Sequence, residues 1–269
     1  MSEPETPLRM QTDAAPMVPH TALLVGARGG LGQAWQPRLL QHEACEALLA
    51  CRRGPLAEGV GDQSTGRGRT IELTLDLEDP ASIEAAAQAA REHIERLGLP
   101  PLRKVIVASG LLHAPALQPE KSLRALDAFT LHRLMAVNAI GPALVARHLF
   151  PLMPRQGRVV FAAVSARVGS ISDNRLGGWY GYRASKAALN QFIRTLAIEW
   201  SRTAKESVCV ALHPGTVDTP LSQPFQGNVP EGRLFTPDES VGHLEAVLQH
   251  LGPQHSGRCY AWDGQEIAP

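Results

Sequence analysis

Tyr182 and Lys186, four residues apart in this 269-residue chain, are a pair whose side chains could move a proton. Residues with this spacing share one face of a helix, so the lysine ammonium could reach the tyrosine phenol and a ligand beside it. A neighbouring positive charge lowers the pKa of a phenol from its ordinary value of about 10. Tyr182 could then give a proton to a carbonyl oxygen, or remove one from an alcohol. The alternative is a lysine that simply extends into solvent.

The residues after this pair predict a helix with a buried face. Apolar side chains continue from Lys186 in steps of three and four residues, at Leu189, Ile193, Leu196 and Trp200. This spacing forms one stripe on an α-helix and directs the pair toward the protein interior. A buried ammonium without partners is costly, so we expect Lys186 to hydrogen-bond a ligand that lies beside the helix.

A glycine-rich loop far upstream indicates that this ligand is a dinucleotide. Gly26, Gly30 and Gly32 directly follow an apolar run and open a helical segment. Glycines permit a tight turn and let backbone N–H groups, such as that of Leu31, approach a pyrophosphate at the positive end of a helix. An ordinary strand-to-helix turn is the alternative, but the position at the start of a β-α-β pattern favours nucleotide binding.

Two arginines at the end of the second apolar run favour NADP over NAD. Arg52 and Arg53 stand where an acidic residue would accept hydrogen bonds from the adenosine ribose hydroxyls. Together with Arg28 they could form charge-assisted hydrogen bonds to the 2′-phosphate of NADP. The alternative is a pair of solvated surface arginines, which would leave NAD possible.

Two aspartates follow the third apolar run and have different expected roles. Asp76, followed by Leu77, closes the run and is expected to bond the adenine amine. Asp79 precedes Pro80 and resembles a helix start, with Asp79 as the cap and Pro80 in the first turn.

Short apolar runs alternate with helical patterns along the chain, which predicts an α/β fold with a parallel sheet covered on both faces. The expected strands are Ala22–Val25, Ala47–Ala50, Ile71–Leu75, Val105–Ala108, Val159–Val164, Val208–Leu212 and Arg258–Trp262. The expected helices are Gly32–Gln41, Pro80–Leu97, Leu123–Leu152 and Tyr182–Trp200. Gly54–Arg69 is expected to be a surface connection.

The composition excludes several classes of function. The 26 Lys and Arg residues balance 26 Asp and Glu residues, so no overall field directs the chain to nucleic acid or membrane. The four cysteines are scattered without metal-ligand spacing, and we expect no metal. No apolar run reaches the roughly 18 residues that span a bilayer, and the first twenty residues lack the apolar centre of a signal peptide. We expect a cytoplasmic protein with a flexible leader over residues 1–19.

Four motifs in order, covering roughly residues 20 to 264, resemble the short-chain dehydrogenase/reductase family. They are the glycine loop, Asn138–Pro142, Tyr182–Lys186 and Pro214–Thr219. The segment 165–180 is similar to the subgroup of C-factor-like proteins and sniffer-type carbonyl reductases. The resemblance implies a Rossmann-type doubly wound sheet of about seven strands in the order 3-2-1-4-5-6-7. It also implies a single NAD(P)-binding domain over residues 20–269, hydride transfer between nicotinamide and a small carbonyl or alcohol substrate, and a homodimer or homotetramer.

The resemblance assigns further residues to the site. Asn138 matches a helix asparagine that helps hold a water in a proton relay with Lys186. Its alternative is a polar residue that satisfies backbone groups at a helix irregularity. The segment matching the nicotinamide cradle contains Pro214, Gly215, Val217 and Thr219. Ser109 and Gly110 stand where the family commonly has a pair of asparagines, and Ser109 is expected to substitute in part.

The serine of this family has no direct counterpart. The usual pattern places it three residues before a glycine, which is Ala166 in this chain. We expect Ser165 to supply the hydroxyl beside the substrate oxygen, with Ser170 as the second candidate. Adjacent strand residues face opposite sides, so the one-residue offset requires a bulge or a strand end to redirect Ser165.

Several apolar residues are expected to enclose the substrate. The Pro- and Gly-rich stretch within residues 217–240 predicts a lid, for which an ordinary surface crossover is the alternative. Trp179, Tyr180, Leu111 and Leu112 are expected to form further walls. Because Ala166 replaces the serine, a second hypothesis is a catalytically weak or inactive dinucleotide-binding regulatory protein.

Overall fold

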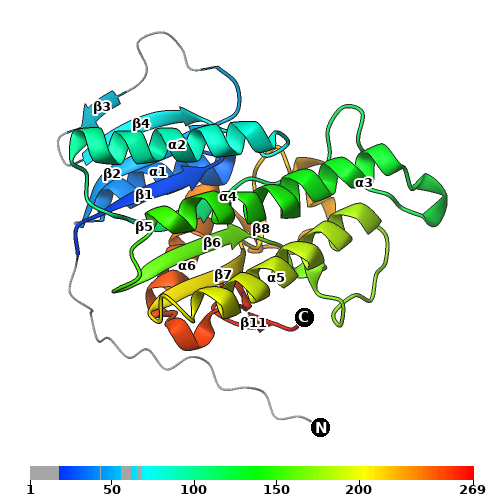
Figure 1. Cartoon of the computed structure of the whole chain (residues 1–269). Coiled ribbons are helices and arrows are strands. Elements are labelled where there is room, and N and C mark those ends of the chain that lie inside the picture. Colours follow the sequence, from blue (N-terminus) through cyan, green and yellow to red (C-terminus); the bar gives the residue numbers. More distant parts are fainter. Residues whose placement is uncertain (1–17, 43, 56–61, 66–67) are drawn as a thin grey trace.

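A computed structural model describes residues 18–42, 44–55, 62–65 and 68–269 (Figure 1). These residues form one large sheet with helices on both faces, which confirms the predicted α/β class. The predicted leader lies outside the described residues, apart from Val18 and Pro19.

Seven parallel strands form the centre of the sheet, and their order confirms the predicted 3-2-1-4-5-6-7 pattern. In sheet order they are β4 (Gly68–Thr74), β2 (Cys45–Arg52), β1 (His20–Val25), β5 (Leu102–Val107), β6 (Val159–Val164), β7 (Ser207–His213) and β10 (Cys259–Ala261). Antiparallel strands β3 (Asp62–Thr65) and β11 (Glu266–Ile267) extend the two edges, so the sheet has nine strands instead of seven. Strands β8 (Thr216–Val217) and β9 (Leu234–Phe235) pair separately.

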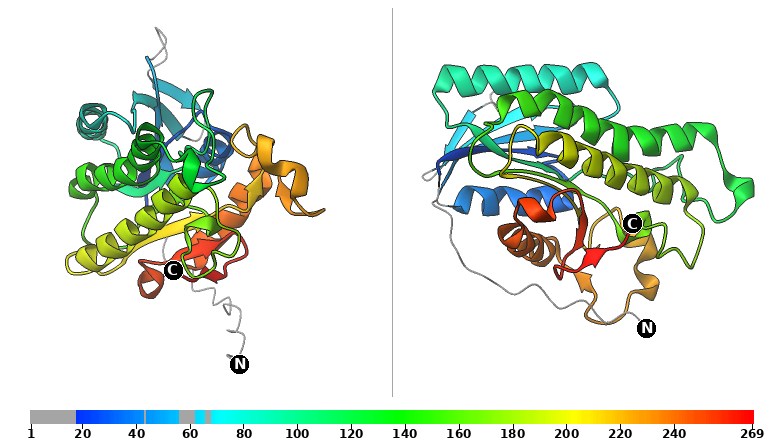
Figure 2. Two further views of the ribbon diagram at one scale, coloured as in Figure 1. Left: turned by 90° about the vertical axis from the view of Figure 1, so that its right-hand side faces the viewer. Right: turned by 60° about the horizontal axis from the view of Figure 1, so that its bottom comes forward.

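Helices cover the sheet in two layers, which Figures 1 and 2 show from different sides. One layer contains α2 (Pro80–Leu97), α3 (Ala128–Met135), α4 (Gly141–Leu149) and α5 (Tyr180–Trp200). The other contains α1 (Gly30–Gln41) and α6 (Pro237–His250). Alternate residues of β1 enter the two cores: Leu23 and Val25 pack with the first layer, Ala22 and Leu24 with the second. This double burial explains why the strands are apolar throughout.

The expected helix over 123–152 is interrupted. A π-helical turn, η2 (Ala136–Ile140), separates α3 from α4, and Asn138 lies in this turn. The combined run Ala128–Leu152 is apolar and long enough, by length and composition, to cross a membrane. Its inner side packs on the sheet, and the core helices of globular proteins pass the same test.

Two other parts differ from the sequence-based expectation. The segment 54–69, expected to be only a surface connection, contains β3 and the first residues of β4. Helix α6 was not predicted, although its start has a capping box between Thr236 and Glu239 that the sequence displays. The predicted cap of α2 is confirmed, because the Asp79 side chain accepts a hydrogen bond from the Ala81 N–H at 3.0 Å.

Candidate active site

A cavity of about 1090 Å³ lies where the parallel strands end and the helices begin. Small-molecule sites commonly occupy about 300–1,000 Å³, so this cavity has room for two ligands. The sheet order reverses beside β1, which is the place where nucleotides bind to folds of this type. Most of the predicted site residues line this cavity. The exceptions are Gly32, Asn138, Ser170 and Tyr180.

The glycine loop lies between β1 and α1, as predicted. Gly26 has φ +88°, a left-handed conformation that side chains disfavour. A Cβ atom at Gly32 would lie 2.0 Å from the Gly26 carbonyl oxygen, so the loop closes only with glycine there. A Cβ at Gly30 would lie 2.5 Å from Thr219 Cγ2, which shows that Thr219 borders the loop. The loop therefore presents bare backbone and the start of α1 to the cavity.

The two arginines after β2 have different environments. Arg52 is 4% exposed, and its Nε donates to Glu72 Oε2 at 2.6 Å. The Nη2 atom of Arg52 is buried and has no hydrogen-bond partner in the described part of the chain. The Arg53 side chain is 69% exposed, with Nη1 3.5 Å from Glu78 Oε2. Arg52 thus brings a positive group with free hydrogen-bonding capacity to the cavity wall.

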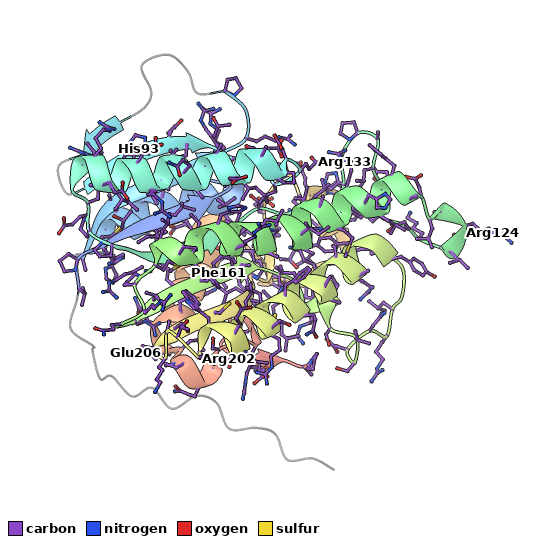
Figure 3. All side chains as sticks on the ribbon, viewed as in Figure 1. His93, Arg124, Arg133, Phe161, Arg202 and Glu206 are labelled. Carbon is purple, nitrogen blue, oxygen red and sulfur yellow. The ribbon has the colours of Figure 1, made fainter. Side chains whose placement is uncertain are left out.

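Other residues at this end also line the cavity. Asp76 Oδ1 accepts a hydrogen bond from the Glu78 N–H at 3.0 Å, which fixes the carboxylate beside the buried Leu77. Glu78 also forms a two-point ion pair with Arg133 of α3, at 2.8 and 3.1 Å; Arg133 is labelled in Figure 3. Arg28 is exposed on the glycine loop.

Tyr182 and Lys186 project from the first turns of α5 into the cavity. Lys186 is 2% exposed; its Nζ donates to the Val164 carbonyl at 2.8 Å and lies 5.8 Å from the centre of the Tyr182 ring. Burial lowers the pKa of Lys186 to about 8. Burial also raises the pKa of Tyr182, which is the reverse of the expected direction. The reason is that the phenol packs among Leu112, Leu117 and Leu134, which disfavour its charged form.

Asn138 connects three segments beneath this pair. Its Oδ1 accepts from the Leu111 N–H at 2.8 Å, and its Nδ2 donates to the Leu111 carbonyl at 2.7 Å and to Ser185 Oγ at 3.0 Å. Ser185 Oγ in turn donates to the Tyr182 carbonyl at 2.8 Å. Both N–H groups of the side-chain amide are used in these contacts, whereas Oδ1 keeps a second lone pair. Sequence reasoning missed the bracing role of Ser185.

The hydroxyls of the two candidate serines bond residues that do not line the cavity. Ser165 follows β6 directly and borders the cavity, but its Oγ donates to Asn190 Oδ1 at 2.7 Å. Ser170 Oγ accepts from the Asp173 N–H at 3.1 Å, and Ser170 is not among the residues that line the cavity. Ala166, by contrast, packs in the same apolar cluster as Tyr182.

Apolar and aromatic side chains line the far end of the cavity. Trp179, Leu111, Leu112 and the lid residues Leu221 and Phe225 gather around Tyr182. The Trp179 ring lies 6.1 Å from that of Tyr182 and 5.0 Å from that of Phe225, both in edge-on geometry. The lid ends are joined by the pairing of β8 with β9.

The expected wall role of Tyr180 is wrong, because its side chain is 41% exposed and lies outside the cavity lining. Sequence reasoning also missed His213, which ends β7 and lines the cavity. Its Nδ1 is buried with no hydrogen-bond partner among the described residues, and burial lowers its pKa to about 4. His213 directly precedes Pro214, the first residue of the predicted nicotinamide segment, and this neighbour could have indicated that His213 lies at the site.

The remaining nicotinamide-end residues are also near one another. Ser109 and Gly110 follow β5; a Cβ at Gly26 would lie 2.4 Å from Ser109 Oγ, and one at Gly110 would lie 3.7 Å from Lys186 Nζ. Pro214, Gly215 and Val217 border the same cavity.

Comparisons with known proteins agree with this geometry. The model of a family described as short chain dehydrogenase matches residues 20–229. A 1-hydroxy-2-glutathionyl-2-methyl-3-butene dehydrogenase from Rhodococcus sp. (strain AD45) is 30% identical over 91% of this chain and 97% of its own. The C-signal protein of Myxococcus xanthus is 38% identical over 50% of this chain and 76% of its own. The NADPH-bound carbonyl reductase from chicken fatty liver is similar in structure, with a TM-score of 0.79, 25% identity, and coverage of 96% of this chain and 97% of that one.

Proposed function

This chain belongs to the short-chain dehydrogenase family, and from that premise we propose that it is an NADP(H)-dependent reductase of carbonyl compounds. The observation that carries the proposal is the presence of Tyr182 and Lys186 in the same cavity as the glycine loop. A proton-transfer pair and a phosphate-binding loop in one cavity fit a reaction in which hydride and proton are transferred together.

The cofactor end supports NADP(H), with NAD(H) as the alternative. The glycine loop leaves room that a Cβ would fill. The buried Nη2 of Arg52 has no hydrogen-bond partner among the described residues, and it could donate to a 2′-phosphate. When bound, the nicotinamide supplies the hydride. We propose that Arg28 and Arg53 add positive charge at the same end, that Asp76 and Leu77 hold the adenine, and that Ser109, Gly110, Pro214, Gly215, Val217 and Thr219 border the nicotinamide. A structural neighbour of 25% identity was solved with NADPH.

Tyr182 fits the role of proton donor in the reducing direction. A phenol with an ordinary pKa of about 10 is protonated at neutral pH and can donate its proton to a carbonyl oxygen, and burial raises the pKa of Tyr182 further. Lys186 would hold the cofactor ribose and, with Asn138, return a proton to Tyr182. Ser165 would act at the substrate oxygen only if its hydroxyl left Asn190.

The substrate end supports an apolar carbonyl compound or alcohol. Trp179, Phe225 and Leu112 offer an apolar wall, and we propose that residues within 217–240 close over it as a lid.

We also propose that residues 20–269 form a single domain of a cytoplasmic protein. Exposed Phe129 of α3 and Phe192 and Ile198 of α5 would let two copies pair as a homodimer or homotetramer.

NADPH oxidation with a panel of aldehydes, ketones and quinones tests the proposal. Turnover of at least one compound, abolished in Tyr182→Phe, is the expected result.

Arg52→Ala tests the choice of cofactor. It should weaken the binding of NADPH by about 10- to 100-fold, because a charge-assisted hydrogen bond contributes about 1.5–3 kcal/mol. The affinity for NADH should change much less, and equal losses would exclude a 2′-phosphate contact.

A second candidate function is a regulatory protein that binds the dinucleotide with weak or no catalysis. Ala166 in the place of the serine and the similarity to C-signal favour it. Cofactor binding without turnover of any compound in the panel would support this function over the first.

A further inference from the structure

The start of α5, which carries Tyr182, is held by an unusual turn. Trp179 has φ +51°. Of the residues that the structure describes, it is the only one other than glycine with a positive φ. Such a conformation costs of order 1–3 kcal/mol in a non-glycine residue and persists only where surrounding contacts impose it. The Trp179 side chain makes no capping hydrogen bond to the helix within the described chain. Something else must therefore hold this turn.

Glu120, about sixty residues earlier in the chain, makes those contacts. Glu120 is 2% exposed, and its backbone carbonyl accepts a hydrogen bond from the Trp179 N–H. Its two carboxylate oxygens accept from the Gly181 N–H at 3.3 and 3.2 Å. A buried carboxylate at a helix start is stabilised by the unpaired N–H groups and the positive end of the helix.

Gly181 permits this close approach. A Cβ at this position would lie 2.8 Å from Glu120 Oε1 and 2.7 Å from Leu134 Cδ1. The carboxylate thus packs directly against the backbone one residue before Tyr182. Glu120 therefore holds the turn at two points. Its backbone carbonyl bonds Trp179 and its carboxylate bonds Gly181, and we call this pair of contacts the clasp.

The clasp also sets the direction of the Trp179 ring. A left-handed residue projects its side chain differently from a helical one, and here the indole lies edge-on to both Tyr182 and the lid residue Phe225. The loop that carries Glu120 also carries Leu112 and Leu117, which pack on Tyr182. Release of the clasp would move the phenol and two walls of the cavity together.

We propose that Glu120 is a positioning residue, which clasps the turn Trp179–Gly181 and thereby fixes Tyr182 and Trp179 for the reaction. The inference rests on the proposed function where it treats Tyr182 as the proton donor. The glycine loop and Arg52 are on other elements, so the phosphate-binding part of the cofactor site does not depend on the clasp, and Lys186 lies one turn further along α5.

The variants Glu120→Ala, Glu120→Gln and Gly181→Ala test this inference. We expect Glu120→Ala to lower kcat by about 10- to 100-fold, the effect of displacing a reacting group by about 1 Å, with the KM for NADPH within about twofold. Glu120→Gln keeps an oxygen acceptor for the Gly181 N–H and should restore kcat to within about threefold of the parent. In Gly181→Ala the new Cβ displaces the Glu120 carboxylate, so this variant should lower kcat by a similar factor. It replaces Glu120→Ala in the test if Glu120→Ala does not fold.

Asp79→Ala is the matched control, because the Asp79 carboxylate caps α2 by accepting a hydrogen bond from the Ala81 N–H at 3.0 Å and does not line the cavity. It should lower thermal stability and leave kcat unchanged below the melting temperature. A fall in kcat no larger in Glu120→Ala than in this control, or an equal change in the KM for NADPH, would overturn the inference.

Trp179 fluorescence, isolated by comparison with Trp179→Phe, gives a readout independent of turnover. Its emission should shift in Glu120→Ala and stay unchanged in Asp79→Ala; an unchanged emission in both would overturn the clasp. If the parent protein turns over no substrate, the proposed function fails, while the fluorescence result still decides whether Glu120 sets the turn.

Discussion

Ala166→Ser tests whether this site lacks a hydrogen-bond donor at the substrate oxygen. Ala166 is half-buried, borders the cavity and packs in the cluster of Tyr182, whereas the Ser165 hydroxyl is committed to Asn190 at 2.7 Å. Tyr182 is therefore the single hydroxyl that we assign to that oxygen. Ala166→Ser would add a second one beside the apolar cluster that contains the tyrosine.

The size of the effect follows from the chemistry of the oxygen. In a preorganised site, one donor to a developing oxyanion contributes about 2.7–4 kcal/mol. A serine on a half-buried wall has no partner that fixes its rotamer, so we expect about half of this. A gain of about 1.4–2 kcal/mol corresponds to a ~10- to 30-fold rise in kcat/KM.

The assay is kcat/KM for NADPH-dependent reduction of one unactivated ketone, with Ser165→Ala and Ser170→Ala measured beside it. Ser170→Ala removes a hydroxyl outside the cavity lining and should leave kcat/KM unchanged. Ser165→Ala should cost less than about threefold, because its hydroxyl already has a partner. An Ala166→Ser enzyme no faster than the parent, or a loss in Ser165→Ala as large as in Tyr182→Phe, would refute the reasoning.

Three further predictions concern stability and cofactor binding. Burial lowers the pKa values of His20 and His213 to about 4 from 6.5, so the unfolded chain binds protons in this window that the folded chain does not. The free energy of unfolding should therefore fall as the pH drops from 6.5 to 4, and His213→Gln should reduce that fall in a urea titration at several pH values. Gly32→Ala places a Cβ 2.0 Å from the Gly26 carbonyl and should abolish NADPH binding in calorimetry; retained affinity would contradict the loop geometry. Phe161→Ala removes a fully buried ring and should cost about 3–5 kcal/mol in denaturant unfolding.

Much of the sheet was predictable because its strands are buried on both faces. Val159–Val164 was predicted with its observed bounds, since a continuous apolar run ends there at a polar residue. The edge strands β3 and β11 were not predicted, because an edge strand needs only one partner and shows no such run. The start of α6 could have been found from its capping box.

The site was less predictable where it depends on contacts between distant segments. Spacing alone places Tyr182 and Lys186 on one face, but the direction of the Tyr182 pKa depends on apolar neighbours from two other segments. The orientation of Ser165 depends on Asn190, 25 residues away. Glu120 reaches the start of α5 from 61 residues away, and no local pattern indicates it.

The pairing of β8 with β9 has a consequence for how this protein could change over generations. Thr216 and Val217 are joined to Leu234 and Phe235, so residues 218–233 leave the body of the protein and return to the same place. Insertions, deletions or exchanges within that excursion need not shift the segments on either side of it. On the function that we propose, the substrate end could thus change through one short stretch of gene, whereas Thr219, which lies in that stretch and borders the glycine loop, would have to be kept.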